Sequence, residues 1–170
     1  MTDPRQQAAG DPPSFPVRRV EERFPDAVMA THAWRGDQTV VLRRDAVVEI
    51  CRFLKGEPDL SFNLFLDLTA VDYLPRAPRF EVVIHLYSIP HRHRIRLKVP
   101  LEESDPAMDT LTGVWRGTDW FEREAWDMYG ILFRGHPNLK RVLLYEEFEG
   151  HPLRKDYPID RRQPLIGPRN

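Results

Sequence analysis

Two histidines stand in the same tripeptide near the carboxyl end of the chain, Gly-His-Pro at residues 135–137 and again at 150–152. Imidazole is the commonest protein ligand for metals, but a metal site needs three or four ligands at fixed geometry. The other candidate ligands lie on separate predicted elements without recognisable spacing: His85, His91, His93 and Cys51. The pattern therefore favours two turns in which His136 and His151 hydrogen-bond to nearby backbone, and it predicts no metal site.

Three carboxylates are the next groups that could do chemistry, because a pair of them can act as general acid and base. They lie within one predicted helix, at Glu122, Glu124 and Asp127. Glu122 and Glu124 project about 160° apart around a helix, so they cannot converge on one substrate atom. Glu124 and Asp127 share a face that is typical of solvated or partner-paired charge. Glu122 lies between Trp126 and Tyr129 and, if buried, needs an arginine or hydrogen-bond donors as partner.

Phosphate-binding loops are missing from the sequence, which contains neither GxGxxG nor GxxxxGK. Nothing therefore predicts that NADH or FMN binds to this chain by a known mechanism. A free-standing enzyme that uses the carboxylates or histidines of residues 118–158 is the alternative from another functional class.

A helix predicted over residues 118–129 positions these carboxylates. Thr118 and Asp119 can cap its start, and Gly130 supplies the left-handed residue at which it ends. Trp120 and Trp126 fall outside its apolar stripe, among charged residues. Two exposed indoles are unfavourable, so we expect the rest of the domain or another subunit to cover them.

Residues 134–170 follow this helix as a proline-punctuated arm. Residues 142–145 can form one short strand, but the remainder is expected to be too polar and too interrupted by proline to fold on itself. The arm carries eight Lys/Arg against five Asp/Glu, a net of +3. This charge fits docking on an acidic or phosphate-bearing neighbour, and a surface extension tied back to its own domain is the alternative.

Docking on a partner is favoured because arginine and tyrosine are enriched at interface hot spots. The predicted subunit interface combines the helix with the arm and comprises Trp120, Glu122, Arg123, Trp126, Asp127, Tyr129, His136, Leu139, Arg141, Gly150, His151, Pro152, Arg154, Lys155, Asp156 and Tyr157.

Before the helix, the sequence predicts one folded domain over residues 17–133, preceded by a disordered leader over residues 1–16. Helices are expected at 17–24, at 46–55 (capped by Asp45 and ended by Gly56) and at 106–114. Strands are expected at 28–34 and 39–42 as a hairpin, and at 62–73, 80–87 and 93–99 as an antiparallel meander. In the first strand of the meander, Phe62, Leu64, Leu66 and Leu68 alternate strictly with other residues, which predicts that they share the apolar face of the sheet.

These elements predict the α+β class: a mostly antiparallel sheet with helices mainly on one face, followed by the extended C-terminal arm. Cys51 falls on the apolar face of its helix and is interpreted as a small buried hydrophobe.

Composition excludes several function classes. The net charge of −1 gives no basic excess for nucleic-acid binding, and a single cysteine cannot ligate an iron–sulfur cluster or form a cysteine zinc site. The amino terminus lacks the apolar region of a secretory signal. The longest apolar stretch, residues 62–74, contains two aspartates and is far shorter than the roughly 20 residues of a membrane helix. We therefore expect membrane association only through partners.

Three segments, EREAWDMYGI, GHPNLKR and FEGHPLRKDYP, resemble the signature region of the C subunit of respiratory complex I, the proton-translocating NADH:quinone oxidoreductase. The mitochondrial counterpart is called the 30 kDa subunit. The motif covers about forty residues of the chain. Membrane-bound hydrogenases and quinone reductases with other electron donors contain relatives of this subunit, and they are the alternative assemblies.

The resemblance implies a non-catalytic structural subunit in the peripheral arm of complex I, on the cytoplasmic side of the cell membrane (the matrix side in mitochondria). It implies that the chain packs on the D subunit, which helps to form the quinone site, near the Fe–S subunits B and I. It further implies no cofactor in this chain, with FMN and the Fe–S clusters held by partner subunits.

Overall fold

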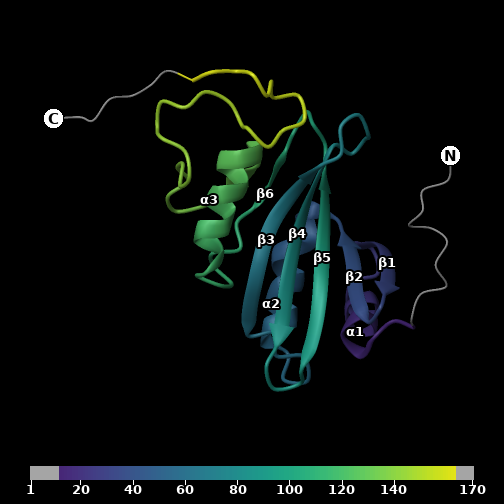
Figure 1. The fold of residues 1–170 in the computed structure, drawn as a ribbon. Coiled ribbons are helices and arrows are strands. Elements are labelled where there is room, and N and C mark those ends of the chain that lie inside the picture. Colours follow the sequence, from purple (N-terminus) through teal and green to yellow (C-terminus); the bar gives the residue numbers. More distant parts are fainter. Residues whose placement is uncertain (1–11, 164–170) are drawn as a thin grey trace.

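A five-stranded sheet in the order β1-β2-β5-β4-β3 organises the computed structural model, which describes residues 12–163 (Figure 1). The strands are β1 (Val28–Trp34), β2 (Asp37–Leu42), β3 (Leu64–Asp72), β4 (Phe80–Ser88) and β5 (His93–Leu101). Strands β3, β4 and β5 form the predicted antiparallel meander, and β1 and β2 form the predicted hairpin. The hairpin joins the meander through a parallel pair, in which Thr39 of β2 lies opposite Arg96 of β5. The α+β prediction is confirmed.

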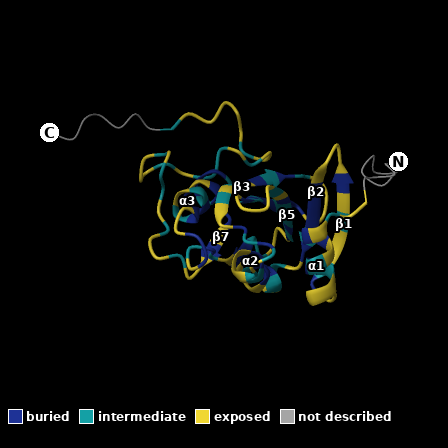
Figure 2. Cartoon of the chain, turned by 90° about the horizontal axis from the view of Figure 1, so that it is seen from below, coloured by how far each residue is buried: buried dark blue, intermediate teal, exposed yellow. Residues whose placement is uncertain are grey.

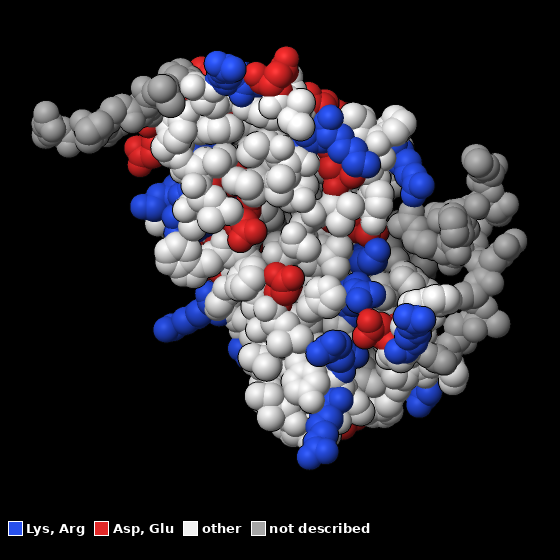
Figure 3. Space-filling model, viewed as in Figure 1, with Lys and Arg blue, Asp and Glu red and all other residues white. Residues whose placement is uncertain are grey.

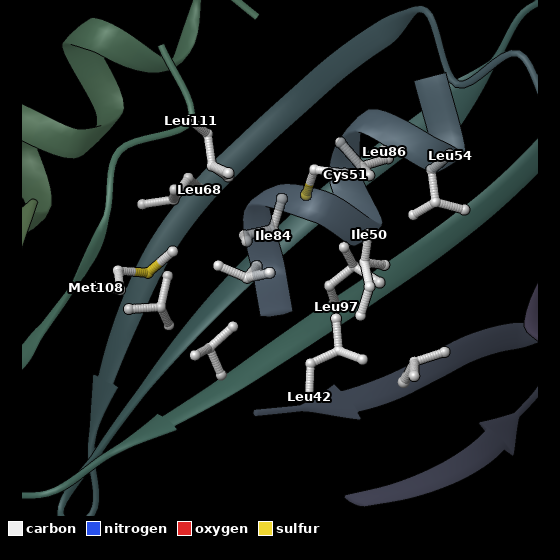
Figure 4. Close-up of a cluster of buried hydrophobic side chains, with 14 of the residues drawn as sticks. Leu42, Ile50, Cys51, Leu54, Leu68, Ile84, Leu86, Leu97, Met108 and Leu111 are labelled. Atoms are coloured by element: carbon white, nitrogen blue, oxygen red, sulfur yellow. The ribbon is translucent and has the colours of Figure 1, made fainter. Parts of the chain in front are cut away.

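Two helices, α1 (Phe15–Arg23) and α2 (Val47–Gly56), lie on the same side of this sheet (Figures 1 and 2). Helix α1 begins two residues before the predicted start at Val17. Most of the predicted leader, residues 1–11, lies outside the described residues. In α2 the side chains of Ile50, Cys51 and Leu54 are fully buried against the sheet (Figure 4). The prediction that Cys51 is a small buried hydrophobe is therefore confirmed, and burial raises the pKa of its thiol because an apolar site disfavours the thiolate.

The helix predicted at 106–114 is wrong. Residues 107–109 instead form β6 (Ala107–Asp109), which pairs in parallel with β7 (Leu132–Arg134), the strand that directly follows helix α3 (Thr118–Tyr129). The error has a physical reason, because the hydrogen-bond partners of β6 lie about 25 residues further along the chain and leave no local pattern. Helix α3 lies between these two strands in the chain, and it packs along β3 of the five-stranded sheet (Figure 1).

A bulge in β3 overturns the predicted alternation at its start. The register shifts between Phe65 and Asp67, so Leu66 has no opposite residue on β4. Leu64 and Leu66 are more than one-third exposed, whereas the Phe65 ring packs edge-on against Phe121 of α3. A bulge bends the strand and turns one extra side chain outward, which strict alternation cannot anticipate.

Three smaller predictions also fail. Asp45 does not cap α2; it lies in a short 3₁₀ turn, η2 (Arg44–Ala46), and its carboxylate pairs with Arg43. Gly117 occupies the N-cap of α3, and the Thr118 hydroxyl donates to the carbonyl of Trp115 rather than capping the helix. Residues 142–145 form no strand. Asp45 and Thr118 bond instead to groups two and three residues earlier in the chain, a local alternative to capping, whereas the N–H groups of residues 142–144 bond to the distant Asp127.

Candidate functional site

The candidate site is the junction between α3 and residues 135–163, the described part of the predicted arm beyond Arg134, which ends β7. This segment runs back over the domain (Figure 1). The last four carbonyls of a helix lack partners within it. At the end of α3 all four are satisfied: the backbone N–H of Gly130 donates to Trp126, and three groups of the arm donate to the next three carbonyls. These donors are His151 Nδ1 to Asp127 at 3.0 Å, Leu153 N to Met128 at 3.1 Å, and Arg154 Nε to Tyr129 at 2.5 Å.

Asp127, which is fully buried, is the main anchor of the arm. Its Oδ2 accepts hydrogen bonds at 3.0 Å from three successive backbone N–H groups, those of residues 142–144. These donors point at the carboxylate, so the predicted strand at 142–145 cannot form. Burial raises the pKa of Asp127, but the N–H of Leu144 and the Arg141 guanidinium outweigh it and hold the pKa below its usual range. The carboxylate is therefore charged and fully occupied.

Arg141 connects the helix to the far part of the arm. Its Nη1 lies 2.6 Å from Asp127 Oδ1, and its Nη2 donates to the carbonyls of Phe148 and Gly150 at 2.6 and 3.2 Å. The guanidinium also lies 5.7 Å from the Trp126 ring centroid, a cation–π distance. The arm thus covers Trp126, one of the two indoles for which we expected a cover.

Glu122 is fully buried and accepts from the Thr110 hydroxyl at 2.5 Å and from the Leu111 N–H at 2.7 Å. The expectation that a buried Glu122 finds hydrogen-bond donors is confirmed. Burial raises its pKa, against the effect of these donors. Nε2 of His136 lies 4.0 Å from Glu122 Oε2.

Both Gly-His-Pro histidines bond to backbone, as predicted. His136 Nδ1 accepts from the N–H of Asn138 at 3.0 Å, so Nε2 carries the proton and donates to the carbonyl of Asp119 at 3.3 Å. His151 has the opposite tautomer, because its Nδ1 must donate to the carbonyl of Asp127. The two turns thereby fasten the arm near the start and at the end of α3.

A second anchor, which the sequence analysis missed, lies where β3 ends and β4 begins. Arg79 and Asp72 are both buried and form a bidentate pair, with Nη2–Oδ2 at 2.8 Å and Nε–Oδ1 at 3.1 Å. Two groups of the arm join them: Asp156 accepts from Arg79 at 2.7 Å, and the Lys155 N–H donates to Asp72 at 2.9 Å. Burial raises the pKa of Asp72, but these donors outweigh it and lower the pKa to about 2. One signal was present in the sequence, because Asp72 continues the buried alternation of Leu68 and Ala70.

Glycine is required at two points of close approach. Gly130 has φ +73°, and a Cβ built there would lie 2.6 Å from the His151 ring and 2.7 Å from the Arg154 guanidinium. Gly150 has φ +95°, and a Cβ there would lie 2.9 Å from the Tyr157 ring. The left-handed conformation and the missing side chain both let the arm lie directly on the helix end.

Over the residues described, the arm is tied back to its own domain, which was the alternative to docking on a partner. Polar anchors, rather than an apolar face, hold it there. Docking of the predicted interface residues on a partner stays a prediction. Arg123 is buried and donates to the carbonyls of Lys140 and Arg141, and Leu139 is half-buried against the core. Pro152 and Tyr157 are half-buried within the arm.

The outer surface of the junction keeps a smaller set of the predicted residues. Trp120 is 62% exposed, with the Arg123 guanidinium 4.7 Å from its ring centroid. Lys155 and Asp156 are also exposed, and the sequence analysis missed two exposed leucines of the same segment, Leu143 and Leu153.

Within residues 12–163, no group of three or more His, Cys, Asp or Glu side chains could hold a metal ion. None of the helices in this range is long and apolar enough to cross a membrane.

Comparisons with known proteins match these features to one family. The family model described as the respiratory-chain NADH dehydrogenase 30 kDa subunit matches residues 40–163. The chain is 44% identical to the NADH-quinone oxidoreductase C subunit of Geotalea uraniireducens, covering 89% of this chain and 92% of the relative. It is 48% identical to the protein of the same name from Roseiflexus sp., covering 84% and 82%.

Two solved structures share the fold. The trypsin-resistant fragment of Nqo5 is 33% identical, with a TM-score of 0.64 over 74% of this chain and all of the fragment. A chain of an archaeal membrane-bound sulfane sulfur reductase is 24% identical, with a TM-score of 0.70 over 84% of each chain, and supports the fold alone. On the family match and the identity to these two relatives, the chain belongs to the 30 kDa subunit family of the respiratory-chain NADH dehydrogenase.

Proposed function

We propose that this chain is a non-catalytic structural subunit that braces the peripheral arm of NADH:quinone oxidoreductase while partner subunits transfer electrons from NADH to quinone, coupled to proton translocation. The family to which the chain belongs supports the proposal that it is part of this complex. One observation supports the absence of catalysis. The buried acid groups of α3 and both Gly-His-Pro histidines are engaged in holding the chain's own backbone, and none is left to act on a substrate.

The proposed partners are the quinone-site D subunit and the Fe–S subunits B and I, and FMN and the clusters belong to partner subunits. We place the contact with these partners on the outer surface of the α3–arm junction. Trp120 of α3 and Leu143, Leu153, Lys155 and Asp156 of the arm are exposed, and a mixture of apolar and charged groups is typical of protein interfaces. The proposed location is peripheral, on the cytoplasmic side of the membrane, with attachment only through the complex.

Purification of the tagged chain from mild-detergent extracts of native membranes tests this proposal. Large Fe–S and quinone-site subunits should co-purify, and the fraction should reduce quinone with NADH. If hydrogenase-type large subunits co-purify and the fraction does not oxidise NADH, the chain belongs to a related complex instead. Recovery of the chain alone would contradict the structural role.

Two variants separate bracing from catalysis. Trp120→Ala removes an exposed indole and should weaken incorporation of the chain by about 2 kcal/mol while its own unfolding is unchanged. Glu124→Gln, an exposed change on the same helix, should leave both incorporation and turnover unaltered. Loss of turnover in fully assembled Glu124→Gln complex would instead support the enzyme alternative.

A further inference from the structure

Two of the three hairpin turns of the sheet, β1–β2 and β4–β5, lie at the same end, and each holds an arginine in a strained conformation. Strands β2 and β5 run parallel and each begins directly after its turn, which brings the two turns together. Arg35 in the first turn has φ +54° and Arg92 in the second has φ +55°. Glycine adopts this left-handed region without the steric cost that any Cβ incurs. An arginine at both positions therefore points to a use for the side chain.

The sheet face that faces away from α1 and α2 carries a line of cations that leads to these turns. On β5, alternation places Arg94, Arg96 and Lys98 on that face. Lys98 pairs with Glu81 at 2.7 Å, and Arg96 lies 3.4 Å from Asp37. Arg96 and Lys98, which lie farther from the turns, are thus neutralised within the chain.

The end of the line at the two turns is not neutralised. Arg35, Arg92 and Arg94 are exposed, and within residues 12–163 none of them forms an ion pair. Figure 3 shows Lys and Arg gathered over the lower right of this face, with few acidic side chains among them. Mutual repulsion of three cations is unfavourable unless an anionic group comes close.

Large apolar side chains flank the same three arginines. Trp34 ends β1 and is 60% exposed, and Ile89 in the β4–β5 turn is 58% exposed. The register places Tyr87 opposite Arg94. Tryptophan, tyrosine and arginine are the residue types that dominate interface hot spots.

We propose that this basic corner, defined as Trp34, Arg35, Tyr87, Ile89, Arg92 and Arg94, docks an acidic segment of a neighbouring subunit. Charge complementarity selects the occupant, since three unpaired guanidinium groups favour clustered carboxylates. The corner is separate from the α3–arm junction, because Asp72 and Phe80 pair at the opposite end of the β3–β4 ladder. The inference rests on the proposed function, which supplies the neighbouring subunits.

Because Arg35 and Arg92 have a left-handed backbone conformation, replacing them with glycine should raise or preserve the stability of the chain while it weakens docking. The double variant Arg35→Gly, Arg92→Gly removes two charges and relieves both strained residues. Its isolated chain should melt at the same or a higher temperature than the wild type. In tagged complex immobilised from native membranes, the variant chain should be released about tenfold faster as salt is raised. The matched control, Arg52→Ala, removes one exposed charge from α2 on the opposite side and should not change release.

A photoreactive benzoylphenylalanine at Trp34 identifies what lies on the corner. Cross-linked peptides from the purified complex should come from another subunit and be rich in Asp and Glu. Unchanged release of the double variant, or a cross-link to lipid or to a peptide without acidic residues, would overturn the inference while leaving the structural role intact. Failure of the wild-type chain to co-purify with any other protein of the complex would overturn both.

Discussion

Asp127 of α3 and Arg141 of the arm form an ion pair with 2.6 Å between Oδ1 and Nη1, and each also binds backbone of the arm. Asp127 holds the N–H groups of residues 142–144, and Arg141 holds the carbonyls of Phe148 and Gly150. The pair therefore organises a segment that contains no helix or strand among the described residues 135–163. Because α3 is packed on the sheet, this places the arm in one defined position on the domain.

Asp127→Asn should destabilise the domain by about 3 kcal/mol, because the half-buried Arg141 loses its counter-ion and three N–H groups lose a charged acceptor. Urea denaturation measures the free energy of unfolding, and limited proteolysis within residues 140–150 reports release of the arm from the domain. Glu124→Gln on the same helix, which removes an exposed charge, is the control and should change neither. Equal stability of the two variants would show that Asp127 is not an anchor.

Gly130→Ala should lower the free energy of unfolding by about 2–3 kcal/mol, because the new Cβ meets the His151 ring and the residue must keep a positive φ. Gly56→Ala is the matched control: a Cβ at Gly56 meets no atom within 4 Å and lies at the end of α2. Thermal unfolding compares the two. A Gly130→Ala protein with wild-type stability and an intact arm would contradict the close packing described above.

Arg79→Met should destabilise the domain far more than Asp156→Asn, although both side chains belong to one cluster. Arg79→Met leaves the buried Asp72 carboxylate without its cation, which we expect to cost about 3–5 kcal/mol. Asp156 is half exposed, so its loss should cost less than about 1 kcal/mol. Chemical denaturation of both variants checks the order, and the reverse order would place the anchor at Asp156.

Acidification should loosen the arm through His151. Burial lowers the pKa of His151 below its ordinary value of 6.5, and the charges of Arg154 and Arg141 lower it further. Between the two values the unfolded chain binds more protons than the folded one. The stabilising contribution of neutral His151 is therefore present above about pH 6.5 and is lost as the pH falls through the folded pKa.

His151→Asn provides the comparison, because an amide N–H can replace Nδ1–H as donor to Asp127 and does not titrate. The melting temperature of the wild type should fall more steeply than that of the variant between about pH 7 and pH 5. Parallel curves would show that His151 does not contribute to the pH dependence.

Regular elements were predictable where one local pattern was enough. The alternation in β4 and β5 and the apolar stripe of α2 follow from burying one face of each element, and Gly130 ends α3 because it adopts a left-handed conformation. The prediction that both Gly-His-Pro imidazoles bind backbone also did not require the partner to be known, since a histidine in a turn has few other hydrogen-bond partners within reach.

Elements whose partners are distant in the chain were not predictable in the same way. The pairing of β6 with β7 and the bulge at Leu66 depend on strands that local patterning does not identify. The Asp72–Arg79–Asp156 cluster was missed for the same reason, since its groups come together only when the arm crosses the end of β3.

The sequence alone determined the family, through the residues of the α3–arm segment, and the α+β class, through the periodicity of its strands and helices. Only the tertiary structure decided what those motif residues bind. The arm is too polar to bury an apolar face, so its position depends on the buried charges Asp127 and Asp72 and on the free carbonyls at the end of α3. Such partners exist only after the domain has folded.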